Sequence, residues 1–171
     1  MAGERVLDSP TEVTELYLES MRRSAAGVSI VVAEMDGRQW ATTITAWCSV
    51  SVSPPTLIIS LSSYTAAAAA VSETQRFGLS LLGTDAQPAA EFGSAAGQAK
   101  FLDQSAHLHP GVDGCVKGAF AHLDCQVQQQ LDVADHRIFV GRVTSAVMFD
   151  EADPLVYSNR QYCGLARWES K

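Results

Sequence analysis

The spacing of apolar positions predicts one helix at the start of the chain, before any strand. Ser9 and Glu12 form a capping box around Pro10, which suits a first helical turn. Gly27 is a typical stop signal. The apolar positions that follow the cap recur at helical spacing and are Val13, Leu16, Tyr17 and Met21. We therefore expect an amphipathic helix whose apolar stripe packs on the core.

From residue 28 onward the apolar pattern changes to the period of strands. Asp36-Gly37 is a hairpin signal, and Ser53-Pro54-Pro55 interrupts a strand. The segment 136–149 is the longest predicted strand, and its apolar run 138–140 predicts burial on both faces. The six strands predicted in this way cover residues 28–34, 39–50, 56–61, 76–82, 119–131 and 136–149, and a further short strand is expected at 154–157.

Helices are predicted between the strands rather than in alternation with them. Residues 66–74, which begin with five alanines, and residues 85–97 have helical patterns, whereas residues 100–118 are typical of a long loop. Sequential antiparallel strands with inserted helices exclude a regular doubly wound sheet. The pattern predicts a mainly β fold with inserted helices, a small closed six-stranded barrel, in one domain spanning residues 1–171.

Composition narrows the classes of function. The chain has 171 residues, 47% of them apolar, and a net charge of −7 without a Lys/Arg-rich block. We therefore expect no nucleic-acid partner and no binding to an acidic membrane surface. An apolar stretch of about 18 residues is lacking, so no membrane span is expected. The unpaired spacing of the cysteines predicts reduced thiols in a cytoplasmic protein; these are Cys48, Cys115, Cys125 and Cys163.

Several common catalytic and binding motifs are missing. The chain contains no Gly-x-Gly-x-x-Gly, no Walker phosphate loop and no Gly-x-Ser-x-Gly elbow. His107 and His109, with Cys115, could hold zinc, but no second ligand pair with suitable spacing follows. We interpret them as polar loop residues and expect no metal site.

Short strings in a fixed order carry a resemblance to a known family. They are Thr43-Ile44-Thr45-Ala46-Trp47-Cys48-Ser49, Pro54-Pro55, Arg76-Phe77-Gly78-Leu79, Asp135-His136-Arg137-Ile138 and Pro154-Leu155-Val156-Tyr157. At these spacings the chain resembles the flavin reductase-like family over about residues 15–162. The resemblance implies a six-stranded antiparallel split β-barrel of the FMN-binding type, which is usually a homodimer.

The resemblance also implies which residues bind the flavin. The isoalloxazine ring is expected against the end of the second strand, and the phosphate at the turn before the helix at 66–74. The cofactor-binding residues implied are Thr43, Thr45, Ala46, Trp47, Cys48, Ser49, Ser62, Ser63, Thr65 and Lys100. The alternative is that the threonines are ordinary strand residues and the serines simply cap a helix. The family's basic residue in the turn is missing, because Ser63 and Tyr64 stand there.

The remaining implied residues concern the pyridine nucleotide. His136 follows Asp135 and is the expected catalytic residue, which would position the nicotinamide over the flavin. Ala134 replaces the family's usual glycine. Arg160 and Tyr162 match a C-terminal Arg-x-Tyr near flavin or nucleotide. The alternative for His136 is a histidine at the start of a strand that is hydrogen-bonded to a turn. The alternative for Arg160 and Tyr162 is a solvated tail.

The function implied is an NAD(P)H:flavin oxidoreductase. It would transfer hydride from NADH or NADPH to FMN or FAD and supply reduced flavin to a separate monooxygenase. One alternative is a flavin-binding protein on the same barrel without reductase activity, either oxidase-like or a binding module; another is a structural dimer without a ligand. The sequence leaves open which flavin, which nucleotide and which oxygenase are used.

Overall fold

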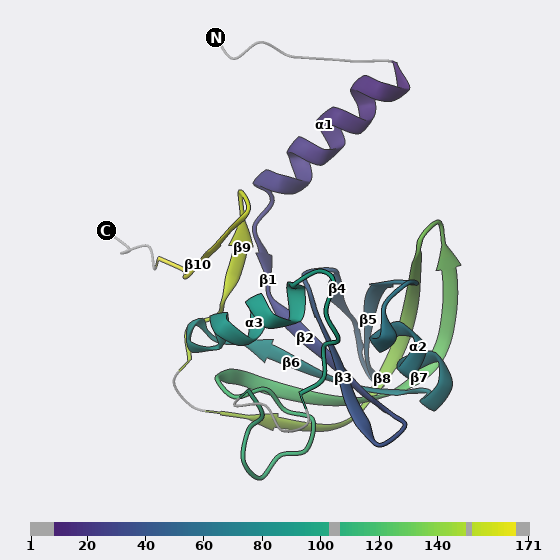
Figure 1. Cartoon of the computed structure of the whole chain (residues 1–171), viewed down its shortest axis with the longest axis vertical. Helices are drawn as coiled ribbons and strands as arrows, with labels where there is room; N and C mark the ends of the chain where they lie inside the picture. Colours follow the sequence, from purple (N-terminus) through teal and green to yellow (C-terminus); the bar gives the residue numbers. More distant parts are fainter. Residues whose placement is uncertain (1–8, 103–106, 150–151, 167–171) are drawn as a thin grey trace.

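The computed structural model describes residues 9–102, 107–149 and 152–166. Its largest element is an antiparallel sheet that curls around a core, as Figure 1 shows. The strands of this sheet, in the spatial order β3-β2-β6-β7-β8-β5-β4, are β2 (Ser29–Met35), β3 (Arg38–Ile44), β4 (Trp47–Val52), β5 (Pro55–Ser62), β6 (Arg76–Leu82), β7 (Ala119–Val133) and β8 (His136–Met148). The prediction of a mainly β fold with inserted helices is confirmed.

Shorter elements lie at the side and at the ends of this sheet. A small sheet of order β1-β9-β10 consists of β1 (Ala26–Gly27), β9 (Val156–Ser158) and β10 (Gln161–Cys163). The helices are α1 (Pro10–Arg23), α2 (Ala66–Thr74), the 3-10 turn η1 (Thr84–Ala86) and α3 (Gln87–Ser94). The helix predicted at 85–97 is therefore a 3-10 turn followed by a shorter α-helix. No helix in the described part of the chain is long and apolar enough to span a bilayer.

The single strand predicted at 39–50 is wrong, because the chain bends at Thr45 and Ala46. On one side of the bend β3 pairs with β2, and on the other side β4 pairs with β5. The two strands end up on opposite edges of the sheet. The large sheet therefore has seven strands instead of six. No pairing within the described residues joins β3 to β4, so the barrel predicted as closed is split at this point.

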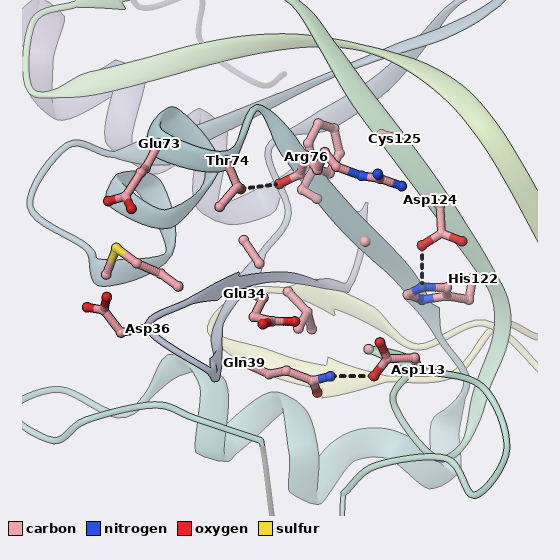
Figure 2. A pocket seen from close by; sticks show the side chains of 16 residues that line it. Glu34, Asp36, Gln39, Glu73, Thr74, Arg76, Asp113, His122, Asp124 and Cys125 are labelled. Atoms are coloured by element: carbon pink, nitrogen blue, oxygen red, sulfur yellow. Dashed lines mark hydrogen bonds and ion pairs between the residues drawn. The ribbon is translucent and has the colours of Figure 1, made fainter.

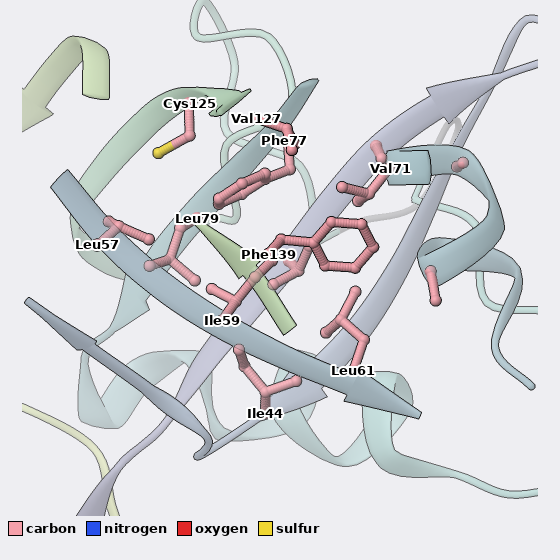
Figure 3. Packing of buried hydrophobic residues seen from close by; sticks show 14 residues of the cluster. Ile44, Leu57, Ile59, Leu61, Val71, Phe77, Leu79, Cys125, Val127 and Phe139 are labelled. Atoms are coloured by element: carbon pink, nitrogen blue, oxygen red, sulfur yellow. The ribbon is translucent and has the colours of Figure 1, made fainter. Parts of the chain in front are cut away.

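The core of the barrel is built from alternate residues of its strands and from one face of α2 (Figure 3). Leu57, Ile59 and Leu61 point inward from β5, and Phe139 meets them from β8. Close packing in this part of the core requires glycine at position 141, because a Cβ atom there would lie 2.6 Å from Cζ of Phe77. The small alanines of α2 let this helix pack closely on β2 and β3.

The prediction of burial on both faces of residues 138–140 is also wrong. Phe139 is fully buried, but Ile138 and Val140 on the opposite face are only half-buried. Leu131, the partner of Ile138 on β7, is 62% exposed. An apolar outer face on β7 and β8 is thus left open. The longest strand is β7, with 15 residues against 13 in β8.

The first helix forms as the cap predicts but does not pack on the core. The side chain of Ser9 accepts from the backbone N–H of Glu12, and the helix ends at Arg23, before Gly27. Gly27 belongs to β1, because the chain becomes extended at Ser24. None of the residues of α1 is buried, and the helix projects away from the large sheet in Figure 1. No element among the described residues covers its apolar stripe.

The loop predicted at 100–118 is described in part, since residues 103–106 lie outside the described residues. Its second part folds back on itself through a bridge between Leu108 and Val116. The helix predicted at 66–74 is confirmed. The turn predicted at 132–135 is shorter than expected, because Asp132 and Val133 belong to β7 and only Ala134 and Asp135 form the turn.

Candidate functional site

Three neighbouring strands bring separate parts of the predicted flavin site to one corner of the sheet. The carbonyl oxygen of Ala46 accepts from the backbone N–H of Ser60 at 2.9 Å. Ser62, at the end of β5, is the register partner of His136, at the start of β8. The backbone N–H of Ser63 then donates to the carbonyl oxygen of Asp135 at 2.9 Å. We call this arrangement the sheet corner: residues 45–49 of the bend and β4, Ser62 and Ser63, and His136.

The imidazole of His136 is held by its neighbour in the chain. Nδ1 of His136 lies 2.8 Å from Oδ1 of Asp135, and the histidine side chain is exposed. The hydrogen bond from His136 holds the pKa of Asp135 below its ordinary value. With Nδ1 donating, Nε2 is the nitrogen left to face a ligand. Ala134 takes a left-handed conformation (φ 52°), which glycine adopts more readily and which explains glycine in the family pattern.

The turn before α2 combines a helix cap with free hydroxyls. Thr65 is the N-cap, because its side chain accepts from the backbone N–H of Ala68 and donates to the carbonyl oxygen of Ser62. Capping therefore accounts for Thr65. In contrast, the hydroxyls of Ser62 and Ser63 have no hydrogen-bond partner within the described residues. Hydroxyls beside a helix N-terminus suit an anion, since the helix dipole favours negative charge there.

A cavity of about 240 Å³ opens beside this helix start. It is lined by Trp40, Ala41, Thr42, residues 64–67 and residues 95–100. Lys100 is the one cationic side chain in that lining, and Thr65 also belongs to the lining, on another segment. The indole N–H of Trp40 is buried and has no hydrogen-bond partner in the described part of the chain. The cation of Lys100 is the feature that makes this cavity suitable for a phosphate group.

The bend and β4 supply an open edge for a flat ring. Cys48 and Ser49 are exposed, and β4 is an edge strand with one side unpaired. Trp47 is fixed here because its indole N–H donates to the carbonyl oxygen of Gly27 at 3.2 Å. Thr43 lies before the bend and donates its hydroxyl to the carbonyl oxygen of Ala90 on α3 at 2.8 Å. The hydroxyl of Thr43 therefore serves packing against α3.

Arg160 and Tyr162 belong to the small sheet and not to the strands of the sheet corner. Asn159 and Arg160 form the tight turn between β9 and β10, with φ of 50° and 62°. The ring of Tyr162 packs against that of Tyr157, with 5.1 Å between ring centroids. Neither Arg160 nor Tyr162 lines the cavity beside α2.

One residue that the sequence analysis did not single out connects the corner to α2. Arg137 donates to the hydroxyl of Ser72 on α2 at 2.7 Å and also pairs with Asp132 across the β7–β8 turn. The hydrogen bond from Arg137 lowers the pKa of Asp132. The sequence contained one signal for Arg137, which is its position directly after His136. A cation beside a residue of the predicted site can bind or position an anionic ligand.

A larger cavity of about 490 Å³ lies elsewhere, among β2, β6 and β7 (Figure 2). Its acidic, basic and histidine lining residues are Glu34, Asp36, Glu73, Arg76, Asp113, His122 and Asp124. The surplus of carboxylates disfavours a flavin phosphate through like-charge repulsion. No three of the described metal-binding side chains are close enough together to hold a metal ion. The sheet corner is therefore a better candidate for a flavin site than this larger cavity.

Comparison with known proteins identifies the family. The model of the flavin reductase like domain matches residues 21–166. The reductase component of 4-hydroxyphenylacetate 3-monooxygenase from Thermus thermophilus is 32% identical over 156 residues, which cover 91% of this chain and 99% of that protein. The NADH-dependent flavin reductase of a Rhodococcus species is 32% identical over 158 residues, or 90% of this chain and 88% of that protein.

A solved structure agrees with these relatives. BorF, the flavin reductase component of a bacterial two-component tryptophan halogenase, superimposes with a TM-score of 0.79 at 28% identity, and the match covers 91% of this chain and 99% of that one. The fold, the order of the motifs and the sequence matches agree over nearly the whole described chain. This protein therefore belongs to the flavin reductase-like family.

Proposed function

We propose that this chain is an NADH-dependent flavin reductase that binds its flavin at the sheet corner and supplies reduced flavin to a separate monooxygenase. Relatives named as NADH-dependent flavin reductases and as reductase components of monooxygenases support the activity and the donor. The single structural observation that carries the proposal is that β5 joins the other two parts of the sheet corner: its Ser60 bonds to Ala46 in the bend before β4, and its Ser62 pairs with His136 of β8.

The reaction needs orientation more than acid–base chemistry. The flavin accepts a hydride from the nicotinamide, which leaves as the oxidised nucleotide. The chain contributes a flat exposed edge at Cys48 and Ser49, and free hydroxyls at Ser62 and Ser63 that fit a phosphate. His136 carries a nitrogen that can hold the carboxamide or ribose of the nucleotide beside the ring. Alignment of the two rings in a water-poor site then supplies the rate enhancement.

A homodimer is part of the proposal. Leu131, Val133 and the outer residues of β8 form an exposed apolar face next to His136. Exposed apolar patches of this kind mark interaction surfaces. A second copy on this face would cover it and exclude water from the flavin. Arg160 and Tyr162, which do not line the cavity beside α2 in their own chain, are candidates to reach the site of the neighbouring copy.

Steady-state kinetics with the purified protein test the activity. Loss of NADH absorbance should depend on added FMN or FAD, and NADPH should be the poorer donor. Flavin binding without NADH oxidation would contradict the proposal. That result would favour a flavin-binding protein without reductase activity, an alternative supported by the absence of a cation in the turn at Ser63 and Tyr64.

A further inference from the structure

We infer that Trp47 is a positioning residue for the flavin, because the hydrogen bond from its indole N–H to Gly27 fixes the bend at which the barrel is split. The inference rests on the proposed function, since it assumes that the flavin ring lies along residues 46–49. The role of Trp47 is exerted through the backbone of the bend and not through a contact between indole and flavin. Three observations carry it: the register of an interrupted ladder, the contacts of the indole, and free backbone donors at the bend.

The bend between β3 and β4 interrupts a regular ladder. β2 and β3 pair antiparallel up to Ser29 and Ile44, and extending that register by two residues along each chain would place Ala46 opposite Gly27. Instead, the carbonyl oxygen of Ala46 accepts from the backbone N–H of Ser60, which lies on the other side of the split. β1 ends at Gly27, and no strand within the described residues lies beside this edge of β1. The backbone partner that a continued β3 would supply to Gly27 is therefore missing.

The side chain of Trp47 reaches Gly27 in place of that backbone partner. Its indole N–H donates to the carbonyl oxygen of Gly27 at 3.2 Å, and a Cβ atom on Gly27 would lie 3.6 Å from Cζ2 of the same ring. The backbone of Trp47 pairs with Ile59 of β5, and its half-buried ring packs against the core of the barrel. β1 leads into β2 after one residue, so Gly27 belongs to the β3 side of the split. One side chain thus joins the two sides of the split.

The same bend leaves backbone donors free where the flavin ring is proposed to lie. The backbone N–H groups of Thr45 and Ala46 have no hydrogen-bond partner within the described residues, and both residues are exposed. The polar edge of an isoalloxazine ring carries carbonyl oxygens and ring nitrogens that accept such hydrogen bonds. Donors bind a ligand more tightly when they are held in place before the ligand arrives. The bond from the indole to Gly27 supplies this constraint, because it fixes the residue that directly follows the two donors.

The deciding experiment compares Trp47→Phe with the wild type. Phenylalanine keeps an apolar aromatic ring but lacks the N–H, so the substitution removes the bond to Gly27. The dissociation constants of FMN and FAD, measured by quenching of flavin fluorescence, should rise about twofold to tenfold, the range that one hydrogen bond supplies. KM for flavin should rise in parallel, whereas KM for NADH and kcat at saturating flavin should stay close to the wild-type values. A variant that only destabilised the fold would lower kcat through the amount of active protein and leave KM unchanged.

Ser158→Ala is the matched control for the loss of one hydrogen bond. The hydroxyl of Ser158 donates to the carbonyl oxygen of Arg23 at 3.3 Å, so this variant also loses a bond from a side chain to the backbone at the small sheet. This bond joins β9 to the end of α1 and does not involve the bend. The flavin dissociation constants of Ser158→Ala should equal those of the wild type. Equal weakening in both variants would show that any loosening of the small sheet affects flavin binding, and would overturn the role assigned to Trp47.

Trp47→Ala distinguishes the hydrogen bond from a direct contact of the ring. If the indole stacked on the flavin, Trp47→Phe would bind flavin as the wild type does and only Trp47→Ala would weaken binding; that result would overturn the inference. With the bond as the cause, both variants bind flavin less tightly. Wild-type affinity in Trp47→Phe, with NADH oxidation intact, contradicts the role of Trp47 alone. Absence of NADH oxidation and of fluorescence quenching in the wild type would remove the proposed function, and this inference with it.

Discussion

Ser63 donates its backbone N–H to the carbonyl oxygen of Asp135 at 2.9 Å, so the turn that begins α2 and the turn that begins β8 are joined. One turn carries the free hydroxyls proposed to hold the flavin phosphate, and the other carries His136. The distance between phosphate and nicotinamide sites is therefore set by strand pairing within a rigid sheet. We therefore expect substitutions at the β8 turn to affect the nucleotide, and substitutions that weaken the start of α2 to affect the flavin.

Substitution His136→Asn should lower kcat for NADH oxidation about tenfold to a hundredfold, since it removes a group that orients the nucleotide. Flavin affinity, measured by fluorescence quenching, should change little, because His136 is proposed to contact the nucleotide. His109→Asn is the control, since His109 packs on Phe149 away from the corner and should retain the wild-type rate. A full rate in His136→Asn would show that the corner does not orient the nicotinamide.

Substitution Arg137→Gln should raise KM for flavin about threefold to tenfold, because the link from β8 to Ser72 on α2 is weakened. The helix start would then hold the phosphate less well, whereas kcat at saturating flavin should stay close to that of the wild type. Arg142→Gln, at an exposed position further along the same strand, provides the comparison. Equal KM values in the two variants would argue against a positioning role for Arg137.

The sequence predicted the elements that depend on local chemistry. The hairpin at Asp36-Gly37, the strand at 76–82 and the capped helix at 66–74 follow from turn residues, alternation and propensity. The bend at Thr45 and Ala46 was missed, because neither residue is a strand breaker. It is imposed by tertiary structure, since β3 and β4 must reach opposite edges of one sheet.

The stripe of α1 shows a second limit of pattern reasoning. Its apolar period predicted a helix correctly, but periodicity cannot say which surface covers that stripe. Tyr17 is 60% exposed in the single chain. The family motifs predicted the segments that form the sheet corner. The role proposed for Arg137 became visible only from its contact with Ser72 in the structure.

Gly78→Ala should destabilise the fold by about 1–3 kcal/mol, the usual cost of overpacking. A Cβ atom at Gly78 would lie 2.6 Å from Cε1 of His122, whose ring is buried against this backbone. Gly164→Ala is the matched control: its Cβ would meet its nearest neighbour at 3.5 Å, and the expected change is within about 0.5 kcal/mol. Denaturant unfolding measures both variants, and equal midpoints would contradict this packing.

The stability of the protein should fall as the solution becomes acidic, partly through His122. Burial lowers the pKa of His122 below its ordinary value of 6.5, although Asp124 opposes the shift. The unfolded chain therefore takes up this proton at higher pH than the folded one, so the free energy of unfolding decreases as pH falls below about 6.5. Above that pH the contribution is fully present.

Unfolding midpoints between about pH 7.5 and pH 5 test this expectation. The neutral variant His122→Gln should show a shallower decrease than the wild type over this range, whatever its absolute stability. The hydroxyl of Ser80 lies 2.9 Å from Nδ1 of His122, and both residues are buried. A protonated His122 would therefore remain poorly solvated on this side of its ring. An identical slope in both proteins would show that His122 is not the group responsible.

The proposed homodimer should depend on the apolar outer face of β7. Leu131→Lys places a charge on an exposed residue of that face, so the monomer should still fold. The dissociation constant of the dimer should rise at least about tenfold. Sedimentation velocity measures the change, with Met148→Lys as the control outside that face. A Leu131→Lys protein that sediments like the wild type would place the interface elsewhere.

A crystal structure of the protein grown with FAD tests the central assignment most directly. We expect the ring along residues 46–49, with phosphate density at the hydroxyls of Ser62 and Ser63 and with His136 beside the ring. Flavin density in the acidic cavity next to His122 and Asp124, with the sheet corner empty, would contradict it.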